Sequence, residues 1–286
     1  MMDSDFSNPL GSNWDVLGKN CQYRASCDAS LAAYQRSKGS SMQTIVLATQ
    51  KGGSGKSTLA ISLARAAIQV GHTVRLIETD TQGTLSNWQS RRPYADPLVE
   101  PIYAARDIAQ RLLTLPRDGA TLTIVDTASG TSAATSAAIR LADLCLIPAR
   151  PSIADIESAA STLRVVRACN KPFAFVLNQA PIRGRRIDDA ATALGDGSSA
   201  DLAGIVARPF IVMRNDHQDA LNAGLAVSEF APASKAADEI RSLWQWVEAK
   251  LCRGLNDHAK SGGELADPRY SAGTASDADA RWDACL

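Results

Sequence analysis

The chain has 286 residues, and its 30 basic and 30 acidic side chains cancel to a formal net charge of zero. That balance excludes a global field that would draw the whole protein to nucleic acid or acidic lipid, so DNA binding would need a local basic patch. Hydrophobic residues make up 45% of the sequence, which is ordinary for a globular protein, and the length suits one large α/β domain or two small ones.

The cysteines indicate a reducing compartment. Six are scattered along the chain without a Cys-x-x-Cys pair, a pattern that disfavours a disulfide framework or a zinc site. The sequence has no signal peptide and no apolar run approaching the roughly 18 residues of a membrane-spanning helix, so it supports neither secretion nor membrane spanning. We therefore expect a cytoplasmic protein.

The two ends of the sequence are polar and lack periodicity. Residues 1–41 are punctuated throughout by Ser, Asn, Asp and Gly, and the segment beyond Arg253 is rich in Gly, Asp and Ser. We expect a disordered or accessory N-terminal arm over 1–41, one domain over 42–252 and a disordered tail over 253–286. An alternative for residues 1–41 is a reading frame that starts upstream of the true initiator, and the sequence leaves both interpretations open.

Between Gln43 and Leu251, apolar runs rich in β-branched residues alternate with helical patterns. This alternation predicts a mostly parallel sheet whose strands are joined by flanking crossover helices, which is an α/β fold. The predicted strands cover residues 44–48, 73–77, 98–103, 121–126, 144–148 and 173–177, and the predicted helices start at Leu59, run through Leu85 and Trp88, and cover 107–115, 153–169 and 234–251. A weaker unit is expected over 188–212.

A glycine-rich stretch follows the first predicted strand and leads into the first predicted helix. Residues 50–58 read Gln-Lys-Gly-Gly-Ser-Gly-Lys-Ser-Thr. In this context glycines allow successive backbone N–H groups to converge on phosphate oxygens, and the helix adds its positive N-terminal end. Lys56 would reach the β- and γ-phosphates of a nucleotide, and Ser57 would place its hydroxyl on Mg²⁺. The predicted phosphate-binding residues are Gly52, Gly53, Ser54, Gly55, Lys56, Ser57 and Thr58. The alternative is a Gly/Ser turn with two solvated lysines, which the flanking strand and helix disfavour.

The strand that ends at Asp126 reads Leu-Thr-Ile-Val-Asp, the usual pattern of a Walker B carboxylate. Such an acid lies near Mg²⁺, generally through a coordinated water, because Mg²⁺ releases its waters reluctantly. The alternative is an acid at an ordinary strand-to-loop turn. Ligands of open α/β sheets lie outside the carboxyl ends of the strands, so we expect the residues that follow strand ends to meet at one edge: Lys56, Asp80, Asp126 and Asn178.

Lys51 stands directly before the first glycine, while Gln50 occupies the place where a standard P-loop has its own first glycine. The run Lys-Gly-Gly-Ser-Gly-Lys-Ser over 51–57 resembles the deviant P-loop of the ParA/MinD family of ATPases, and the resemblance extends over about residues 43–252. In that family the early lysine reaches across a dimer to the partner's nucleotide. The resemblance implies a P-loop NTPase fold, ATP and Mg²⁺ as cofactors, and catalytic roles for Lys51, Lys56 and Asp80.

Two further assignments come from the resemblance. Asp80, in the run Glu-Thr-Asp-Thr-Gln-Gly over 78–83, is similar to the second acid of the family's Asp-x-Asp-Pro-Gln-Gly motif, which helps to orient or activate the attacking water. Here Glu78 replaces the first acid and Thr81 the proline, and a helix N-cap is the alternative for Asp80. Asn178 matches the family position whose side-chain amide contacts the adenine edge. The loop after the Walker B acid reads Thr-Ala-Ser-Gly instead of the family's Thr-Pro-Pro or Thr-Pro-Gly, so we expect the γ-phosphate to be contacted differently.

The resemblance is closest to the short ParA-type partition ATPases. It implies slow ATP hydrolysis, an ATP-dependent homodimer, nonspecific DNA binding in the ATP state, a ParB-like DNA-binding partner that stimulates hydrolysis, and association with the nucleoid in the cytoplasm. The basic residues that would bind DNA phosphates are Arg183, Arg185, Arg186, Arg208, Arg214, Lys235 and Arg241. The alternative is a set of scattered, solvated side chains, because sequence does not show that they share a face.

Other functions stay open. MinD-like positioning ATPases end in a basic amphipathic helix that lies on membrane, but the apolar stripe of the last predicted helix, with Leu243, Trp244 and Val247, has the spacing of a stripe that packs on a sheet, so we do not expect membrane binding. A nucleotide-binding regulatory module with little turnover is kept open by Thr81 and by Ala128–Ser129. The absence of a Cys-x-x-Cys pair disfavours a metal-cluster carrier of the same superfamily, and no substrate-specific domain supports an amidoligase.

Overall fold

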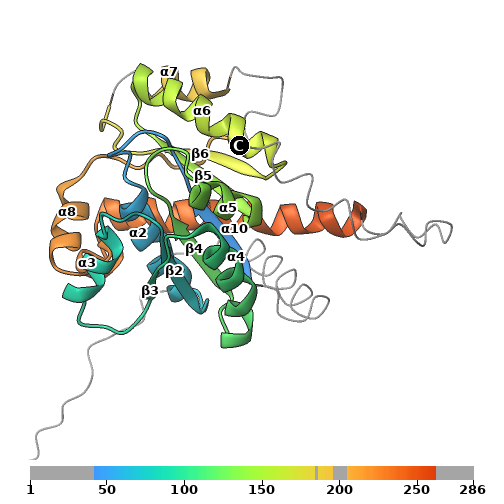
Figure 1. Ribbon diagram of the computed structural model, residues 1–286. Coiled ribbons are helices and arrows are strands. Elements are labelled where there is room, and N and C mark those ends of the chain that lie inside the picture. Colours follow the sequence, from blue (N-terminus) through green and yellow to red (C-terminus); the bar gives the residue numbers. More distant parts are fainter. Residues whose placement is uncertain (1–41, 184–185, 196–204, 262–286) are drawn as a thin grey trace, which may run out of the picture. The chain divides into compact units, whose positions relative to one another are not determined.

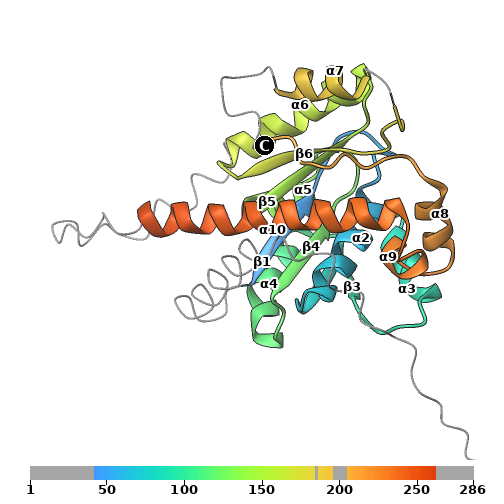
Figure 2. The same ribbon diagram turned by 180° about the vertical axis from the view of Figure 1, so that it is seen from behind.

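The computed structural model describes residues 42–183, 186–195 and 205–261, and these form one α/β unit (Figures 1 and 2). Its sheet has six strands in the order β3-β2-β4-β1-β5-β6, and all neighbouring pairs are parallel. The strands are β1 (Gln43–Leu47), β2 (Val74–Glu78), β3 (Leu98–Pro101), β4 (Leu122–Asp126), β5 (Leu144–Ala149) and β6 (Phe173–Leu177). The predicted α/β fold with a parallel sheet is confirmed.

Helices connect the strands and cover both faces of the sheet. They are α2 (Lys56–Gln69), α3 (Thr84–Arg91), α4 (Ala105–Thr114), α5 (Ala133–Leu141), α6 (Ile153–Ala168), α7 (Arg186–Gly195), α8 (Asn215–Asn222), α9 (Val227–Phe230) and α10 (Lys235–Ser261), with a short 3₁₀ turn, η2 (Leu115–Asp118). The predicted N-terminal arm lies outside the described residues, as does the part of the predicted tail after Ser261.

The central strands are buried on both faces, which explains their continuous apolar runs. Every residue of β1, β4 and β5 is buried. Side chains alternate between the faces along a strand. In β1, Ile45 and Leu47 join the cluster packed against α2 and α10, whereas Val46 joins the cluster on the other face, against α4, α5 and α6.

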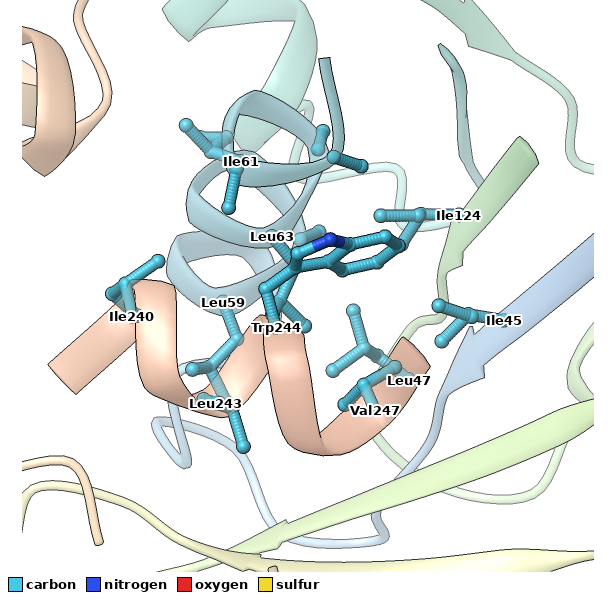
Figure 3. Packing of buried hydrophobic residues seen from close by; sticks show 14 of the residues in the cluster. Ile45, Leu47, Leu59, Ile61, Leu63, Ile124, Ile240, Leu243, Trp244 and Val247 are labelled. Atoms are coloured by element: carbon cyan, nitrogen blue, oxygen red, sulfur yellow. The ribbon is translucent and has the colours of Figure 1, made fainter. Parts of the chain in front are cut away.

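The last helix, α10, packs its apolar stripe on the sheet. Figure 3 shows Leu243, Trp244 and Val247 among side chains of α2, β1 and β4, and all three are at most 2% exposed. Burial of a leucine or valine of this kind is worth about 1.5–3 kcal/mol as an upper estimate. The stripe is thus part of the core. In the described part of the chain, no helix is both long and apolar enough to cross a membrane.

The structure differs from the sequence prediction at several helices. The prediction ended the last helix at Leu251, but α10 continues to Ser261, since one glycine, Gly254, costs a helix only about 1 kcal/mol and does not by itself end it. The prediction missed α5, whose alanine-rich sequence has little apolar contrast and whose start is capped by the Ser132 hydroxyl. It also missed the short helices α8 and α9.

Candidate functional site

The carboxyl ends of three neighbouring strands lie level with one another. Leu47 of β1 pairs with Asp126 of β4, and Asp126 pairs with Glu78 of β2. The loops that follow these residues therefore leave the sheet at the same edge, where open α/β sheets bind their ligands. This register brings together the glycine-rich loop, Asp126 and the loop that carries Asp80, as the sequence predicted.

The glycine-rich loop connects β1 to α2. Gly53 and Gly55 have φ angles of 74° and 87°, a left-handed conformation that other residues adopt only at a cost. Gly55 is the N-cap residue of α2, and no side chain caps this helix end. The first turn of α2 therefore presents unpaired N–H groups to the site, an arrangement that binds anions such as phosphate. Ser57 and Thr58 lie in this turn.

Lys56 is directed toward acidic groups at the same edge. It is 7% exposed, and its Nζ donates a hydrogen bond to Ser129 Oγ at 3.0 Å. Burial lowers the pKa of Lys56, while the charges of Asp126 and Asp80 oppose this effect. Ser129 belongs to the loop that departs from the family pattern, so that loop supplies a hydroxyl to the lysine.

Asp126 is a buried carboxylate without a hydrogen-bonding partner. It is 1% exposed, and neither of its carboxylate oxygens accepts a hydrogen bond that meets normal geometry from any described residue. Burial raises its pKa to about 7, although the nearby Ser57 hydroxyl and Lys56 ammonium pull it down. A buried acid is costly unless a cation or hydrogen bonds compensate it. Asp126 together with Ser57 offers hard oxygen ligands, which suit Mg²⁺.

A protein-only metal cage is absent from the described parts of the chain, where no three His, Cys, Asp or Glu side chains are grouped to hold an ion. Mg²⁺ in phosphate-transfer sites is commonly held by one or two protein ligands, with phosphate oxygens and water completing its shell. The donor set of Asp126 and Ser57 fits that mode and gives no support to a zinc site.

Two acids, Glu78 at the end of β2 and Asp80 in the loop that leads to α3, lie in different environments. Glu78 is fully buried and accepts hydrogen bonds from the backbone N–H groups of Leu85 (2.6 Å) and Ser86 (3.2 Å), and from the Ser86 hydroxyl. It therefore caps the first turn of α3, so the alternative of Asp80 as the N-cap is wrong. The carboxylate of Asp80 accepts one hydrogen bond, from Gln82 N within its own turn at 3.0 Å, and its charge acts on Lys56 and Asp126.

Lys51 is bound within its own chain, away from Lys56. Its Nζ donates to Asp155 Oδ2 at 2.8 Å, and Asp155 lies near the start of α6 with its side chain 2% exposed. Arg150 Nε (3.1 Å) and the Ser152 hydroxyl also donate to Asp155. Burial by itself would raise the pKa of Asp155, but the three hydrogen bonds together lower it below its ordinary value. Within this chain the charge of Lys51 is thus neutralised by a buried carboxylate.

Asn178 and Gln179 follow β6 and contact the glycine-rich loop. Asn178 is 5% exposed and donates from Nδ2 to the carbonyl oxygen of Ser54 at 2.8 Å. Gln179 donates from Nε2 to the carbonyl oxygen of Gly53 at 2.9 Å. The predicted contact between Asn178 and adenine stays a prediction, but the second amide hydrogen and the amide oxygen of Asn178 are not used by the described residues.

The predicted basic residues do not form one unpaired patch. Arg214 pairs with Glu239 at 2.6 Å and Arg241 pairs with Asp238, so their charges are largely neutralised. Arg183, Arg208 and Lys235 are exposed, whereas Arg185 and the side chain of Arg186 lie outside the description. Three basic residues that the sequence did not single out lie at or just after the end of α6: Arg164 and Arg167 are exposed in its last turns, and the half-buried Lys171 follows the helix.

Four residues of this site were not assigned a role from sequence: Glu78, Ser129, Asp155 and Gln179. Sequence offered weak signals for two of them. Ser152 and Asp155 have the Ser-x-x-Asp spacing of a helix start, and Glu78 stands where relatives carry an acid. Nothing local indicates that Lys51 meets Asp155, because 104 residues separate them.

Comparison with known proteins agrees with the geometry. The family described as CobQ/CobB/MinD/ParA nucleotide binding domain matches residues 45–227, from β1 to the start of α9. "Protein ParA" of Rhizobium radiobacter is 34% identical over 130 residues, which cover 44% of this chain and 56% of that protein. "Maintenance of carboxysome distribution protein A" of Halothiobacillus neapolitanus is 26% identical over 208 residues, covering 70% of this chain and 94% of the relative.

Among solved structures, the cell division ATPase MinD of Pyrococcus furiosus superposes with a TM-score of 0.58 at 16% identity, covering 73% of this chain and 99% of MinD. At that identity the likeness concerns the fold alone. The family match spans more than half of the chain and contains the glycine-rich loop and Asp126. The chain therefore belongs to the family of CobQ/CobB/MinD/ParA nucleotide-binding domains.

Proposed function

We propose that this protein is a ParA-like ATPase that binds ATP and Mg²⁺, dimerises on ATP, and acts as a nucleotide switch in partitioning DNA, which it binds without sequence preference. The observation that carries the proposal is the pair of lysines around one glycine-rich loop. Lys56 lies inside the site beside Asp126 and Asp80, while Lys51 lies outside it on Asp155. A lysine that starts the phosphate loop yet does not serve its own site is suited to serve the site of a second subunit.

In the proposed reaction, backbone N–H groups of the loop and of the first turn of α2 bind the ATP phosphates. Lys56 holds the β- and γ-phosphates, and Ser57 and Asp126 hold Mg²⁺, which neutralises charge on the phosphates when bound. Asp80 orients the attacking water, and Lys51 of the opposite subunit stabilises the charge on the transferred phosphoryl group. One orienting acid and two lysines account for slow hydrolysis that a ParB-like partner accelerates.

A subunit-mixing experiment tests whether Lys51 acts across a dimer. Lys51→Ala and Asp80→Ala homodimers should each hydrolyse ATP poorly. In a one-to-one mixture, half of the dimers pair the two variants, and in each of these one site has its own Asp80 and the Lys51 of the neighbour. Hydrolysis should recover to about a quarter of the wild-type rate per subunit, as two-fold symmetry requires. If the mixture stays as inactive as its components, Lys51 acts within its own subunit and the proposal fails.

DNA binding is proposed through the exposed basic side chains near β6 and the end of α6. Arg208 and Arg183 are exposed, as are Arg164 and Arg167 in the last turns of α6. Contacts with phosphates need only clustered positive charge and weaken steeply with salt. Arg208→Glu and Arg167→Glu should lower duplex affinity, whereas Arg241→Glu, which alters an arginine already paired with Asp238, should lower it much less.

A second candidate is the positioning of a protein assembly, because the relative named for carboxysome distribution aligns over 94% of its length. The same dimer switch would serve there, with a different cargo and the same ATP cycle. A nucleotide-binding regulatory module with little turnover is a third candidate, but the hydrogen bond that Lys56 Nζ donates to Ser129 Oγ gives the divergent loop a contact with the lysine proposed to hold the phosphates. Measurable ATP hydrolysis in the wild-type protein would exclude that third candidate.

A further inference from the structure

We infer that Asn178 and Gln179 are positioning residues of the phosphate loop: they hold the carbonyl oxygens of Ser54 and Gly53 outward, so that the N–H groups of the loop face the phosphates. This inference rests on the proposed nucleotide-binding function. The segment after β6 would then orient the phosphate-binding loop, in addition to the expected contact of Asn178 with the base.

The contacts are direct and come from one short segment. Nδ2 of Asn178 lies 2.8 Å from the Ser54 carbonyl oxygen, and Nε2 of Gln179 lies 2.9 Å from that of Gly53. A carbonyl oxygen only accepts, so the nitrogen of each amide must face the loop. The Asn178 contact is buried, where a hydrogen bond is stronger than in water and its loss is costly.

Because of the geometry of the peptide bond, these two contacts also fix the direction of the N–H groups that would bind the phosphates. In a trans peptide the C=O of one residue and the N–H of the next point in opposite directions. Holding the Ser54 carbonyl outward therefore turns the N–H of Gly55 inward, and holding the Gly53 carbonyl does the same for the N–H of Ser54. Among the described residues, the backbone N–H groups of Ser54 and Gly55 donate no hydrogen bond. They are left free for a ligand with acceptor oxygens.

Two further observations show that the chain accommodates this arrangement. A Cβ at Gly55 would lie 2.3 Å from Asn178 Nδ2, so glycine at this position provides room for the asparagine as well as a left-handed φ. Gln179 itself has a φ of 52°, a conformation that is unfavourable for a residue other than glycine. The strained residue is the one whose amide reaches the loop, as expected for a position selected for its contact rather than for local stability.

Because Gln179 has a strained backbone conformation, its replacement by glycine is the most informative variant. Gln179→Gly removes the amide and at the same time relieves the backbone, so the melting temperature should stay close to wild type while phosphate binding weakens. Asn178→Ala removes the second contact. A matched control is Gln89→Ala, since the Gln89 amide also bonds backbone groups, at Pro97 and Val99, but lies outside the site.

The experiment is calorimetric titration of the full chain with Mg²⁺–ATP and, separately, with inorganic triphosphate, which has no base, combined with melting temperatures. We expect Gln179→Gly and Asn178→Ala to bind both ligands about three- to tenfold more weakly, the range of one net hydrogen bond. Gln89→Ala should bind both as wild type does.

Three results would overturn the inference. If Asn178→Ala weakened ATP binding but left triphosphate binding unchanged, the asparagine would act on the base alone, and the proposed function would stand. If Gln179→Gly bound both ligands like wild type, the phosphate-binding loop would not depend on the hydrogen bond from Gln179 to the Gly53 carbonyl oxygen. If wild-type protein bound neither ligand, the proposed nucleotide function would fail and the inference with it.

Discussion

Replacing Asp155 by asparagine is expected to strengthen ATP-dependent dimerisation, because it removes the charge that holds Lys51 in its own subunit. Lys51 Nζ lies 2.8 Å from Asp155 Oδ2, and the Lys51 side chain is 35% exposed. A hydrogen bond to a charged group is worth about 1.5–3 kcal/mol, and solvent screening at this exposure reduces the value to about 1 kcal/mol. A symmetric dimer releases two such contacts, so the gain is about 2 kcal/mol, or about 30-fold in the dimer dissociation constant.

The assay is sedimentation equilibrium with ATP–Mg²⁺ in an Asp80→Ala background, where hydrolysis does not deplete the ligand. Asp155→Asn keeps the size of the side chain and its place in the first turn of α6. Asp238→Asn is the matched control, because it removes the charge that pairs with Arg241 on α10 and should leave the dimer constant unchanged. An unchanged or weaker dimer in Asp155→Asn would refute the reasoning that Lys51 has to leave Asp155 to reach the partner subunit.

Three further outcomes follow from the site. Lys56→Ala should abolish ATP binding measured by calorimetry, since it removes the only cation that the site places beside both Asp126 and Asp80 in the described structure; wild-type affinity would contradict this. Asp80→Ala should bind ATP normally and hydrolyse it slowly, and a wild-type rate would exclude its role in orienting water. Burial raises the pKa of Asp126 from 3.8 to about 7, so between these pH values the folded state holds a proton that the unfolded chain releases. This bound proton stabilises the folded state by about 4 kcal/mol in total, and the stabilisation is fully present below pH 4 and lost as pH rises to 7. The free energy of unfolding of Asp126→Asn, measured in urea without nucleotide, should therefore rise relative to that of wild type between pH 4 and pH 8. A difference between the two proteins that does not change with pH would contradict the burial argument.

The sequence was informative where a feature is local. Buried parallel strands appear as continuous apolar runs, and the glycine-rich loop and Asp126 occur directly after such runs. Because strand ends share one edge of the sheet, these patterns predict that Lys56, Asp80 and Asp126 lie together. Helix α5 was missed since alanine-rich segments carry little apolar contrast, although Ser132 supplies a normal helix start.

Contacts between distant segments were beyond the sequence. The contact of Gln179 with Gly53 joins residues 126 positions apart, and that of Lys51 with Asp155 joins residues 104 apart. Charge pairing was equally hidden: Arg214 and Arg241 read as free basic residues, but each has an acidic partner on α10. Surface charge in this chain depends on which side chains meet, and residue types alone do not determine that.

The most direct test of the central claim is sedimentation of the Asp80→Ala protein with ATP–Mg²⁺, with and without nonspecific duplex DNA, at two salt concentrations. A partition-type switch requires a dimer that forms only with ATP and co-sediments with DNA, more weakly at the higher salt. ATP-dependent dimers that ignore DNA would move the function to the positioning of a protein assembly. If no dimer formed under any condition, the chain would share the fold of its family without the mechanism proposed for it.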